Sequence, residues 1–340
     1  MNHSILVTCY GDSEGQGRGL YLLDIEQLRL SIKPLHYSAA KPGGCIAVGN
    51  NLFLSEQSAT GECGFSHLSY SSTDKSLTLQ SEQSFPYVFS SFVALNQKQL
   101  LVSSFYDGVD ALIDISPEIA IKQEYQHPFI HANSDDPRQQ ASHPHHVGVI
   151  NANYLFSIDM GSDAIRLHYW DGERLESTDD AWISRPAGTG PRIMRITQNK
   201  KFAYLLNEIS NQVSVYRLDF SQGKPVAEHI QDISTLASNV ESSAAGIQLS
   251  ADDKYLAVSN RGEDTVVLYA INSASGALTL FDRQSCVAIP RDILIHENYL
   301  LVAGQKADAI QLFEIQAQSG QLSAISTLNN VPAPVGFTLL

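Results

Sequence analysis

The chain has 340 residues, 43% of them hydrophobic, and its 22 basic and 36 acidic side chains give a formal net charge of −14. This hydrophobic content is typical of globular proteins and excludes general disorder. The acidic balance disfavours nucleic acid and anionic membranes as partners, because both attract basic proteins. The four cysteines lack metal-ligand spacing, and the first residues lack the basic flank and long apolar core of a signal peptide. We therefore expect a cytoplasmic protein.

Seven short apolar segments, each followed by a polar turn, recur at a spacing of about fifty residues. In chain order they read ILVTCYG, NLFLSEQ, QLLVSSFYDG, NYLFSIDMGSD, KFAYLLNEISN, KYLAVSNRGED and NYLLVAGQKAD. A strand-rich repeat of this length is typical of β-propeller blades. The sequence therefore predicts an all-β fold, a seven-bladed β-propeller of four-stranded antiparallel blades, with residues 1–340 forming a single domain.

The four strands of one blade can be followed from residue 144 onward. HHVGVI alternates, YLFSID follows a turn at 151–153, AIRLHYW follows MGSD, and RLEST follows the hairpin signal at Asp171-Gly172. The three later units repeat this pattern. Segment 220–242 is the least strand-like, so we expect a helical turn or a long loop there. Segment 334–340 is expected to supply a strand that closes the ring against the first blade.

Blade topology brings polar motifs from distant parts of the sequence together. The loop that enters the innermost strand and the loop that leaves the second strand lie on the same face of the ring. Arg in these loops suits bidentate recognition of phosphate or carboxylate, and His and Glu can move protons. The candidate catalytic residues are His145, Arg192, Glu208 and Arg261, and the candidate substrate-binding residues are His143, Arg291 and Lys306.

Several nearby residues have a structural interpretation. Asp159 is expected to close a turn by accepting hydrogen bonds from backbone N–H groups, and the matched Asn207 and Asn260 are expected to stabilise equivalent turns. Arg291 could equally pair with a backbone carbonyl or a carboxylate. His143 could serve only to shape its loop, because it precedes a proline and is restricted to extended backbone.

We expect neither a metal nor a cofactor. The histidines at 143–146 lie in one extended stretch, without the Cys or HExxH context of a metal site. His146 is expected to point away from His145, since successive side chains alternate along a strand. No glycine-rich phosphate loop joins a strand to a helix.

Taken in this order, the motifs resemble the seven-bladed lactonase family, over nearly the whole chain and more strongly from residue 137 onward. The segments that carry the resemblance are PRQQASHPHHVGVI, SIDMGSDAI, GTGPRIMRIT, LLNEISNQVSVY, SAAGIQLSADDKYLAVSNRGEDTVVLY and IPRDILIHENYLLVAGQKADAIQLF. The resemblance implies hydrolysis of 6-phosphoglucono-1,5-lactone to 6-phosphogluconate in the pentose phosphate pathway. The family also includes a carboxymuconate cyclase, whose proposed site of one His, two Arg and one Glu corresponds by motif to the four candidate catalytic residues. The family usually has His after Gly-Pro-Arg, where this chain has Ile193.

As a mechanistic hypothesis, the two arginines would hold the phosphate or the lactone carbonyl oxygen. Glu208 would activate water, and His145 would relay the proton. The expected partner is a small anionic, phosphorylated sugar lactone, with no nucleic acid and no membrane, and the oligomeric state is left open. Two alternatives are a lactonase or cyclase acting on another carboxylate or sugar lactone, which Ile193 favours, and a non-catalytic propeller that serves as a binding module.

Overall fold

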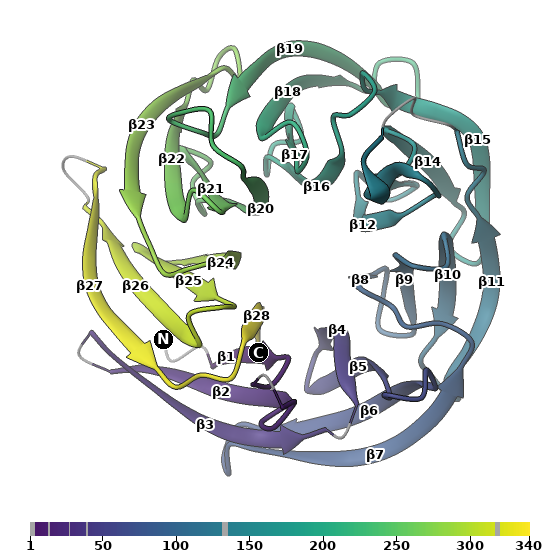
Figure 1. The fold of residues 1–340 in the computed structure, drawn as a ribbon. Coiled ribbons are helices and arrows are strands. Elements are labelled where there is room, and N and C mark those ends of the chain that lie inside the picture. Colours follow the sequence, from purple (N-terminus) through teal and green to yellow (C-terminus); the bar gives the residue numbers. More distant parts are fainter. Residues whose placement is uncertain (1–3, 13, 27, 39, 131–134, 317–319) are drawn as a thin grey trace.

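The computed structural model describes residues 4–12, 14–26, 28–38, 40–130, 135–316 and 320–340. These residues form seven four-stranded antiparallel sheets, arranged as blades around a central channel (Figure 1). The predicted all-β, seven-bladed propeller is therefore confirmed. Within the described part of the chain, the only helical element is a short 3-10 turn, η1 (Pro137–Gln139). None of the described residues belong to a helix that is long and apolar enough to cross a membrane.

Each blade runs from an innermost strand beside the channel to an outermost strand at the rim (Figure 1). Blade 1 contains β28 (Pro334–Leu339), β1 (Ile5–Cys9), β2 (Gly19–Glu26) and β3 (Arg29–Tyr37). Blade 2 contains β4 (Lys41–Val48), β5 (Asn51–Gln57), β6 (Cys63–Ser71) and β7 (Ser76–Phe85). Blade 3 contains β8 (Ser91–Ala94), β9 (Gln99–Ser104), β10 (Val109–Asp114) and β11 (Ala120–Gln126).

The remaining blades keep strict chain order from the channel outward. Blade 4 contains β12 (Pro144–Val149), β13 (Tyr154–Asp159), β14 (Ala164–Trp170) and β15 (Leu175–Ser184). Blade 5 contains β16 (Pro191–Ile196), β17 (Phe202–Asn207), β18 (Gln212–Asp219) and β19 (Val226–Ser234). Blade 6 contains β20 (Ser243–Leu249), β21 (Tyr255–Arg261), β22 (Thr265–Ile271) and β23 (Leu278–Ser285). Blade 7 contains β24 (Pro290–His296), β25 (Tyr299–Gly304), β26 (Ala309–Ile315) and β27 (Leu322–Asn329).

The seven repeated segments form the second strand of each blade, which is almost entirely buried. All six residues of β9 and of β17 are buried, because these strands are covered on both faces by neighbouring blades. The core therefore lies between blades: one cluster joins Leu206 and Val215 of blade 5 to Val258 and Val267 of blade 6. Burying both faces through stacking is what makes each blade depend on its neighbours.

Segment 220–242 differs from its prediction. Residues 226–234 form the outermost strand β19, which pairs with β18 from Asp219↔Val226 to Gln212↔Ser234. The expectation of a helical turn or a long loop across this segment is therefore wrong for its centre. The sequence pattern is weak because an outermost strand packs on only one side, so half of its positions are free to be polar.

The ring is closed by a strand from each end of the chain. β28 pairs with β1 from Ile5↔Leu339 to Cys9↔Pro334, so blade 1 takes its innermost strand from the C-terminus and the other three from the N-terminus. Figure 1 shows the two strands side by side at the channel. The predicted closing strand is confirmed.

An Asp or Asn ends the turn after the second strand in blades 4 to 7. Each adopts a left-handed backbone conformation, which these residue types tolerate better than most; they are Asp163, Asn211, Asp264 and Asp308. Their side chains then bind the chain that enters the next blade. For example, Asp264 Oδ1 accepts from the Ile289 N–H at 2.9 Å. We call these four the blade-linking residues.

Candidate active site

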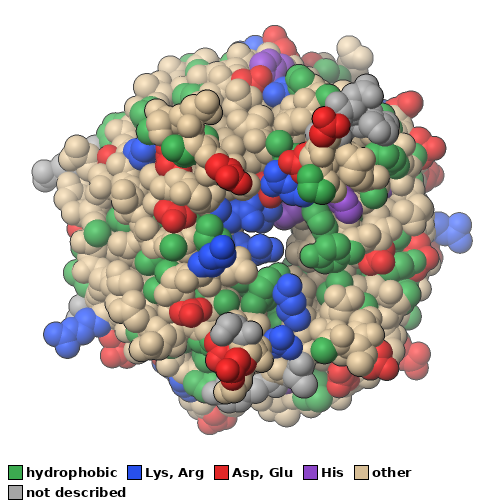
Figure 2. Space-filling view, viewed as in Figure 1, with side chains coloured by type: hydrophobic (Ala, Val, Ile, Leu, Met, Phe, Trp, Pro, Cys, Tyr) green, Lys and Arg blue, Asp and Glu red, His purple; other side chains and the backbone are tan. Residues whose placement is uncertain are grey.

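A cavity of about 780 Å³ lies at the central channel, within the usual size range of small-molecule sites. It is lined by five cationic residues, Lys41, Arg138, Arg192, Arg261 and Arg291, and by three acidic residues, Asp107, Glu208 and Asp292. Figure 2 shows Lys and Arg side chains around the hollow at the centre of this face. Because this local balance is the reverse of that of the whole chain, the cavity favours an anionic ligand.

A recurring β-bulge turns particular side chains toward this cavity. In β12, β16 and β24, pairing with the second strand skips the residue that follows the initial proline. The skipped residues are His145, Arg192 and Arg291, and all three line the cavity. A bulge re-aims the side chain of its extra residue, and the proline tolerates the first strand position because it has no N–H to pair.

Glu208, directly after β17, is the centre of a buried charge cluster. It is 5% exposed, and its backbone N–H donates to the Gly190 carbonyl at 2.7 Å. Three guanidinium groups contact its carboxylate: that of Arg192 at Oε2, and those of Arg138 and Arg261 at 2.8 and 2.9 Å from Oε1. Burial alone would raise the pKa of Glu208, but these cations lower it far below its ordinary value of 4.5. The carboxylate is therefore held ionised and is a weak base.

Each arginine of the cluster is fixed by a second contact. Arg192 donates from Nε to the Ala245 carbonyl at 3.0 Å, and although burial lowers its pKa to about 10, it stays charged at neutral pH. Arg261, the last residue of β21, donates from Nε to the Ser243 carbonyl at 3.3 Å.

Arg138 belongs to the cluster, but sequence reasoning missed it. It lies in η1, where its Nη2 is 2.7 Å from Asp136 Oδ2 while its Nη1 reaches Glu208. The only signal in the sequence is the Asp-Pro-Arg triplet, in which Asp136 caps a turn by accepting from the Arg138 N–H at 2.9 Å. Arg138 reaches the channel from the segment that precedes β12. Strand periodicity in the sequence does not predict where a residue outside the strands will lie.

His145 provides a neutral imidazole beside the cluster. Its Nδ1 is buried and has no hydrogen-bond partner among the described residues, and its ring meets Phe105 edge-to-face at 5.6 Å. Burial, and then the positive charge of Arg192, lower the pKa of His145 well below its ordinary value of 6.5. An uncharged imidazole in a cavity lining can take a proton from a bound water.

Two predicted substrate-binding residues lie outside the cavity lining, whereas the third, Arg291, is part of it. His143 stacks on Phe105 with 4.5 Å between ring centroids and donates from Nδ1 to the Phe105 carbonyl at 2.8 Å. Lys306 is exposed in the turn after β25. His143 packs on a loop of blade 3 and Lys306 is exposed to solvent, so the structure does not bring these two residues into the cavity lining.

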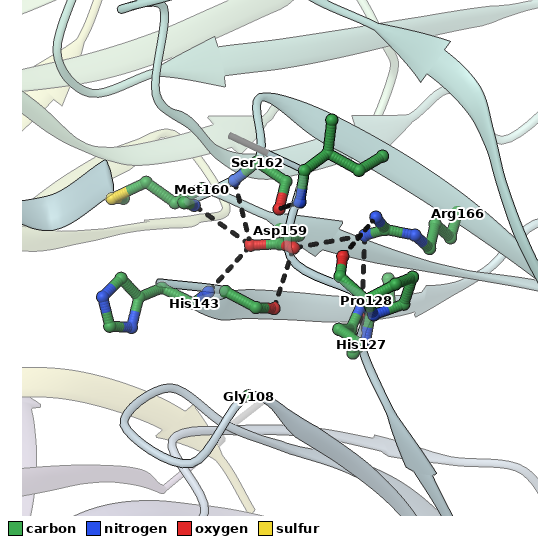
Figure 3. A network of polar contacts seen from close by, with 12 residues as sticks. Gly108, His127, Pro128, His143, Asp159, Met160, Ser162 and Arg166 are labelled. Carbon is green, nitrogen blue, oxygen red and sulfur yellow. Dashed lines mark hydrogen bonds and ion pairs between the residues drawn. The ribbon is translucent and has the colours of Figure 1, made fainter. Parts of the chain in front are cut away.

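The structural interpretation of Asp159 is confirmed (Figure 3). Its Oδ1 accepts from backbone N–H groups on two loops, those of His143 at 2.8 Å, Gly161 at 3.0 Å and Ser162 at 3.3 Å. Its Oδ2 contacts Ser142 Oγ at 2.8 Å and Arg166 Nη1 at 3.2 Å. Asp159 therefore fixes the loop that carries the sequence into β12.

Asn207 and Asn260 also have the structural role expected of them. Asn207 donates from Nδ2 to Ser214 Oγ at 2.8 Å, and Asn260 donates from Nδ2 to Thr265 Oγ1 at 3.0 Å, each within its own hairpin. The residues that follow them, Glu208 and Arg261, contact each other instead. The hairpin contact of the Asn is thus the same in blades 5 and 6, whereas the residue that follows the Asn differs.

A further buried cluster joins blades 3 and 4 and resembles a metal site only in composition. The carboxylate of Asp110 accepts from Nε2 of His127 at 2.6 Å and from Nε2 of His168 at 3.0 Å. The other ring nitrogen of His127 faces Arg166 Nη1 at 3.2 Å. A metal-bound imidazole normally donates its second N–H to an acceptor, so a guanidinium at this position does not fit a metal ligand. The cluster is a hydrogen-bonded network between blades.

Together, the fold and the cavity define a β-propeller with a cationic small-molecule site at its channel. The family model described as "Lactonase, 7-bladed beta-propeller" matches residues 4–339, and the chain belongs to this family. Family membership supports lactonase activity.

The relatives are distant, although they match over most of their length. The chain is 24% identical over 292 residues to the 6-phosphogluconolactonase of Bacillus subtilis (strain 168), which covers 83% of this chain and 82% of that protein. A structure of a periplasmic gluconolactonase from Pseudomonas aeruginosa superposes with a TM-score of 0.88 at 24% identity, covering 100% of this chain and 99% of that one. A crystal structure of a protein from Lactobacillus plantarum gives a TM-score of 0.88 at 22% identity, covering 100% of both chains. At this identity, the structural likeness bears on the fold.

Proposed function

We propose that the protein hydrolyses 6-phosphoglucono-1,5-lactone to 6-phosphogluconate, a step of the oxidative pentose phosphate pathway. The observation that carries the proposal is one cavity that combines a neutral imidazole, the buried guanidinium group of Arg192, the partly buried one of Arg261 and an excess of positive charge. The family supports a lactonase, and the Bacillus subtilis relative is named for this substrate. The excess charge favours a phosphorylated lactone over a neutral one.

In the proposed mechanism, His145 is the general base. Neutral His145 takes a proton from a water molecule as the water oxygen bonds to the lactone carbonyl carbon, giving a tetrahedral oxyanion and an imidazolium. Arg192 and Arg261 donate hydrogen bonds to the oxyanion. The intermediate then collapses, the bond between the carbonyl carbon and the ring oxygen breaks, and the imidazolium returns its proton to the leaving oxygen. The products are a carboxylic acid and a free hydroxyl group.

Glu208 has a different role from the one expected from sequence. Water activation needs a carboxylate that can accept a proton near neutral pH, and the three guanidinium contacts oppose that. We assign to Glu208 the positioning of Arg192 and Arg261, because one carboxylate holds both side chains against their mutual repulsion.

One observation favours a second candidate, a lactone without phosphate. Ile193 lines the cavity at the position where the family usually has His, and an apolar side chain adds no hydrogen bond for a polar substrate. The cellular compartment of the protein depends on which lactone is its substrate, since a phosphorylated sugar does not cross membranes unaided. With the phosphorylated lactone we propose a cytoplasmic protein; cell fractionation that placed it outside the cytoplasm would favour the second candidate.

The test is a lactonase assay on freshly generated 6-phosphogluconolactone and on glucono-1,5-lactone, each corrected for spontaneous hydrolysis. We expect higher kcat/KM with the phosphorylated lactone, and a loss of kcat of about 10²–10⁴ in His145→Gln, as is typical when a general base is removed. Hydrolysis of only the unphosphorylated lactone would select the second candidate. Failure to hydrolyse either lactone, with the protein folded, would favour a binding module.

A further inference from the structure

Two of the five cavity cations differ from the other three in having no carboxylate partner. Arg138, Arg192 and Arg261 share Glu208, whereas Lys41 and Arg291 form no ion pair with any residue in the described ranges. Their positive charges are therefore not compensated by the protein around them.

Both free cations lie against the ring of Tyr10. Lys41 Nζ is 4.4 Å from the ring centroid, and the guanidinium carbon of Arg291 is 5.4 Å from it. In such cation–π contacts the negative face of the aromatic ring attracts the cation without neutralising its charge. An aromatic face thus orients both side chains but, unlike a carboxylate, leaves their charges available to a ligand.

These three residues come from adjacent blades on one side of the channel. Lys41 begins β4 of blade 2, Tyr10 follows β1 of blade 1, and Arg291 is the bulge residue of β24 in blade 7. Glu208 follows β17 of blade 5, and Figure 1 shows β17 across the ring from β4 and β28. The cavity therefore extends from a base-and-arginine end at blades 4 to 6 to an end at blades 1 and 2 that holds Tyr10 and Lys41. Arg291 of blade 7 lies between them, and its charge helps to lower the pKa of His145, Arg192 and Arg261.

We propose that Lys41, Arg291 and Tyr10 form an anion subsite that takes the phosphomonoester of the substrate. Two cations match the two negative charges of such a group; Arg supplies a planar fork of donors, and Lys supplies a mobile point charge. The lactone carbonyl then lies toward His145 at the other end. The orientation of the lactone rests on the proposed function, while the subsite itself requires only a doubly charged phosphate group.

Calorimetric binding tests the subsite without depending on catalysis. The ligands are 6-phosphogluconate, gluconate and inorganic phosphate, and the variants are Lys41→Gln and Arg291→Gln. We expect each variant to lose about tenfold or more in affinity for 6-phosphogluconate, as typical of a lost charge-assisted contact, and to change little for gluconate. Equal losses for 6-phosphogluconate and gluconate, or no loss, would overturn the subsite.

Matched variants separate charge, packing and orientation. Lys306→Gln removes a charge from blade 7 outside the cavity and should leave binding unchanged. Tyr10→Phe should retain the affinity for 6-phosphogluconate, because the ring face remains, whereas Tyr10→Leu should weaken it. Equal binding by these two Tyr10 variants would remove Tyr10 from the subsite. Melting temperatures within a few degrees of wild type would exclude misfolding as the cause.

Kinetics then distinguish the two proposals. If the lactone is hydrolysed, we expect Lys41→Gln and Arg291→Gln to raise KM for the phosphorylated lactone by a larger factor than KM for glucono-1,5-lactone. Hydrolysis with an unaltered KM would reject the subsite and keep the lactonase. Loss of 6-phosphogluconate binding in a protein that hydrolyses neither lactone would keep the subsite and reject the lactonase.

Discussion

Glu208 contacts three guanidinium groups, and this pairing decides which residue can serve as a base. A carboxylate with a pKa far below 4.5 keeps its charge but gives up basicity. The neighbouring His145, kept neutral by burial and by Arg192, has the opposite properties. In the proposed mechanism, the same desolvated cavity thus separates two functions, positioning by the carboxylate and proton transfer by the imidazole.

Glu208→Gln should destabilise the protein by about 3 kcal/mol at pH 7, because it leaves buried arginines without their counter-charge. The folded-state pKa of Glu208 lies below its unfolded value, so its stabilisation is present above pH 4.5 and is lost as the pH falls through the folded pKa. Urea unfolding at several pH values measures this, and the difference between wild type and variant should shrink in acid. Glu228→Gln, which breaks an exposed ion pair with Arg217, is the control and should cost under about 1 kcal/mol. Similar costs for the two variants would contradict the role of Glu208.

The acid limb of the pH–rate profile should report His145. Because its pKa is lowered, the imidazole stays neutral below pH 6.5, and kcat/KM should hold at pH 6 before falling in more acidic solution. Initial rates in a buffer series, corrected for spontaneous hydrolysis, check this. An apparent pKa at or above 6.5 would argue against a desolvated His145 as the base.

Much of this site could be predicted from sequence, because blade topology fixes which loops meet. His145, Arg192, Glu208 and Arg261 do lie together. Arg138 was missed because it reaches the channel from a long loop. Lys41 was missed because its own blade resembles the family weakly, and its partner is an aromatic ring rather than a charged group.

At the level of elements, two local devices shape the propeller. The bulge after the first proline of β12, β16 and β24 aims one side chain per strand at the cavity. In blades 4 to 7 the blade-linking residues follow the end of the second strand, close to the pairing of the bulge, and bind the chain that enters the next blade. An Asp or Asn is the last residue of four of the repeated segments in the sequence, but its left-handed backbone and its contact with the following blade are seen only in the structure.

Asp308→Ala should destabilise the protein by about 2 kcal/mol. The variant loses the side-chain acceptor for the Ala333 N–H, 2.9 Å away, and places alanine at a φ of 47°. Asp308→Asn is the matched control, because Asn211 occupies the equivalent position in blade 5, and it should cost much less. Chemical unfolding of both variants measures the difference. Equal losses in the two would show that neither backbone conformation nor the retained acceptor matters at this position.

Across the whole molecule, the repeat made the fold predictable, whereas the rim strands were harder to read. β19 was not predicted as a strand because only one of its faces packs, so its sequence contains no continuous apolar run. The inner strands were readable because stacking buries both faces.

Deleting residues 334–340 should lower the melting temperature by several degrees and weaken ligand binding. The deletion exposes the edge of β1, and it removes Val335, Gly336, Phe337 and Thr338 from the cavity wall. Thermal unfolding followed by circular dichroism, together with 6-phosphogluconate titration, tests both effects. An unchanged melting temperature would mean that β28 is dispensable for ring closure.

The shared blade has a consequence for the order in which the protein is made. β1, β2 and β3 are synthesised before the strands of blades 2 to 7, whereas their innermost partner β28 is synthesised after them. The edge of β1 that pairs with β28 therefore stays unpaired while blades 2 to 7 are translated. A stop codon before β28 would leave that edge unpaired, so ring closure depends on translation having passed β28.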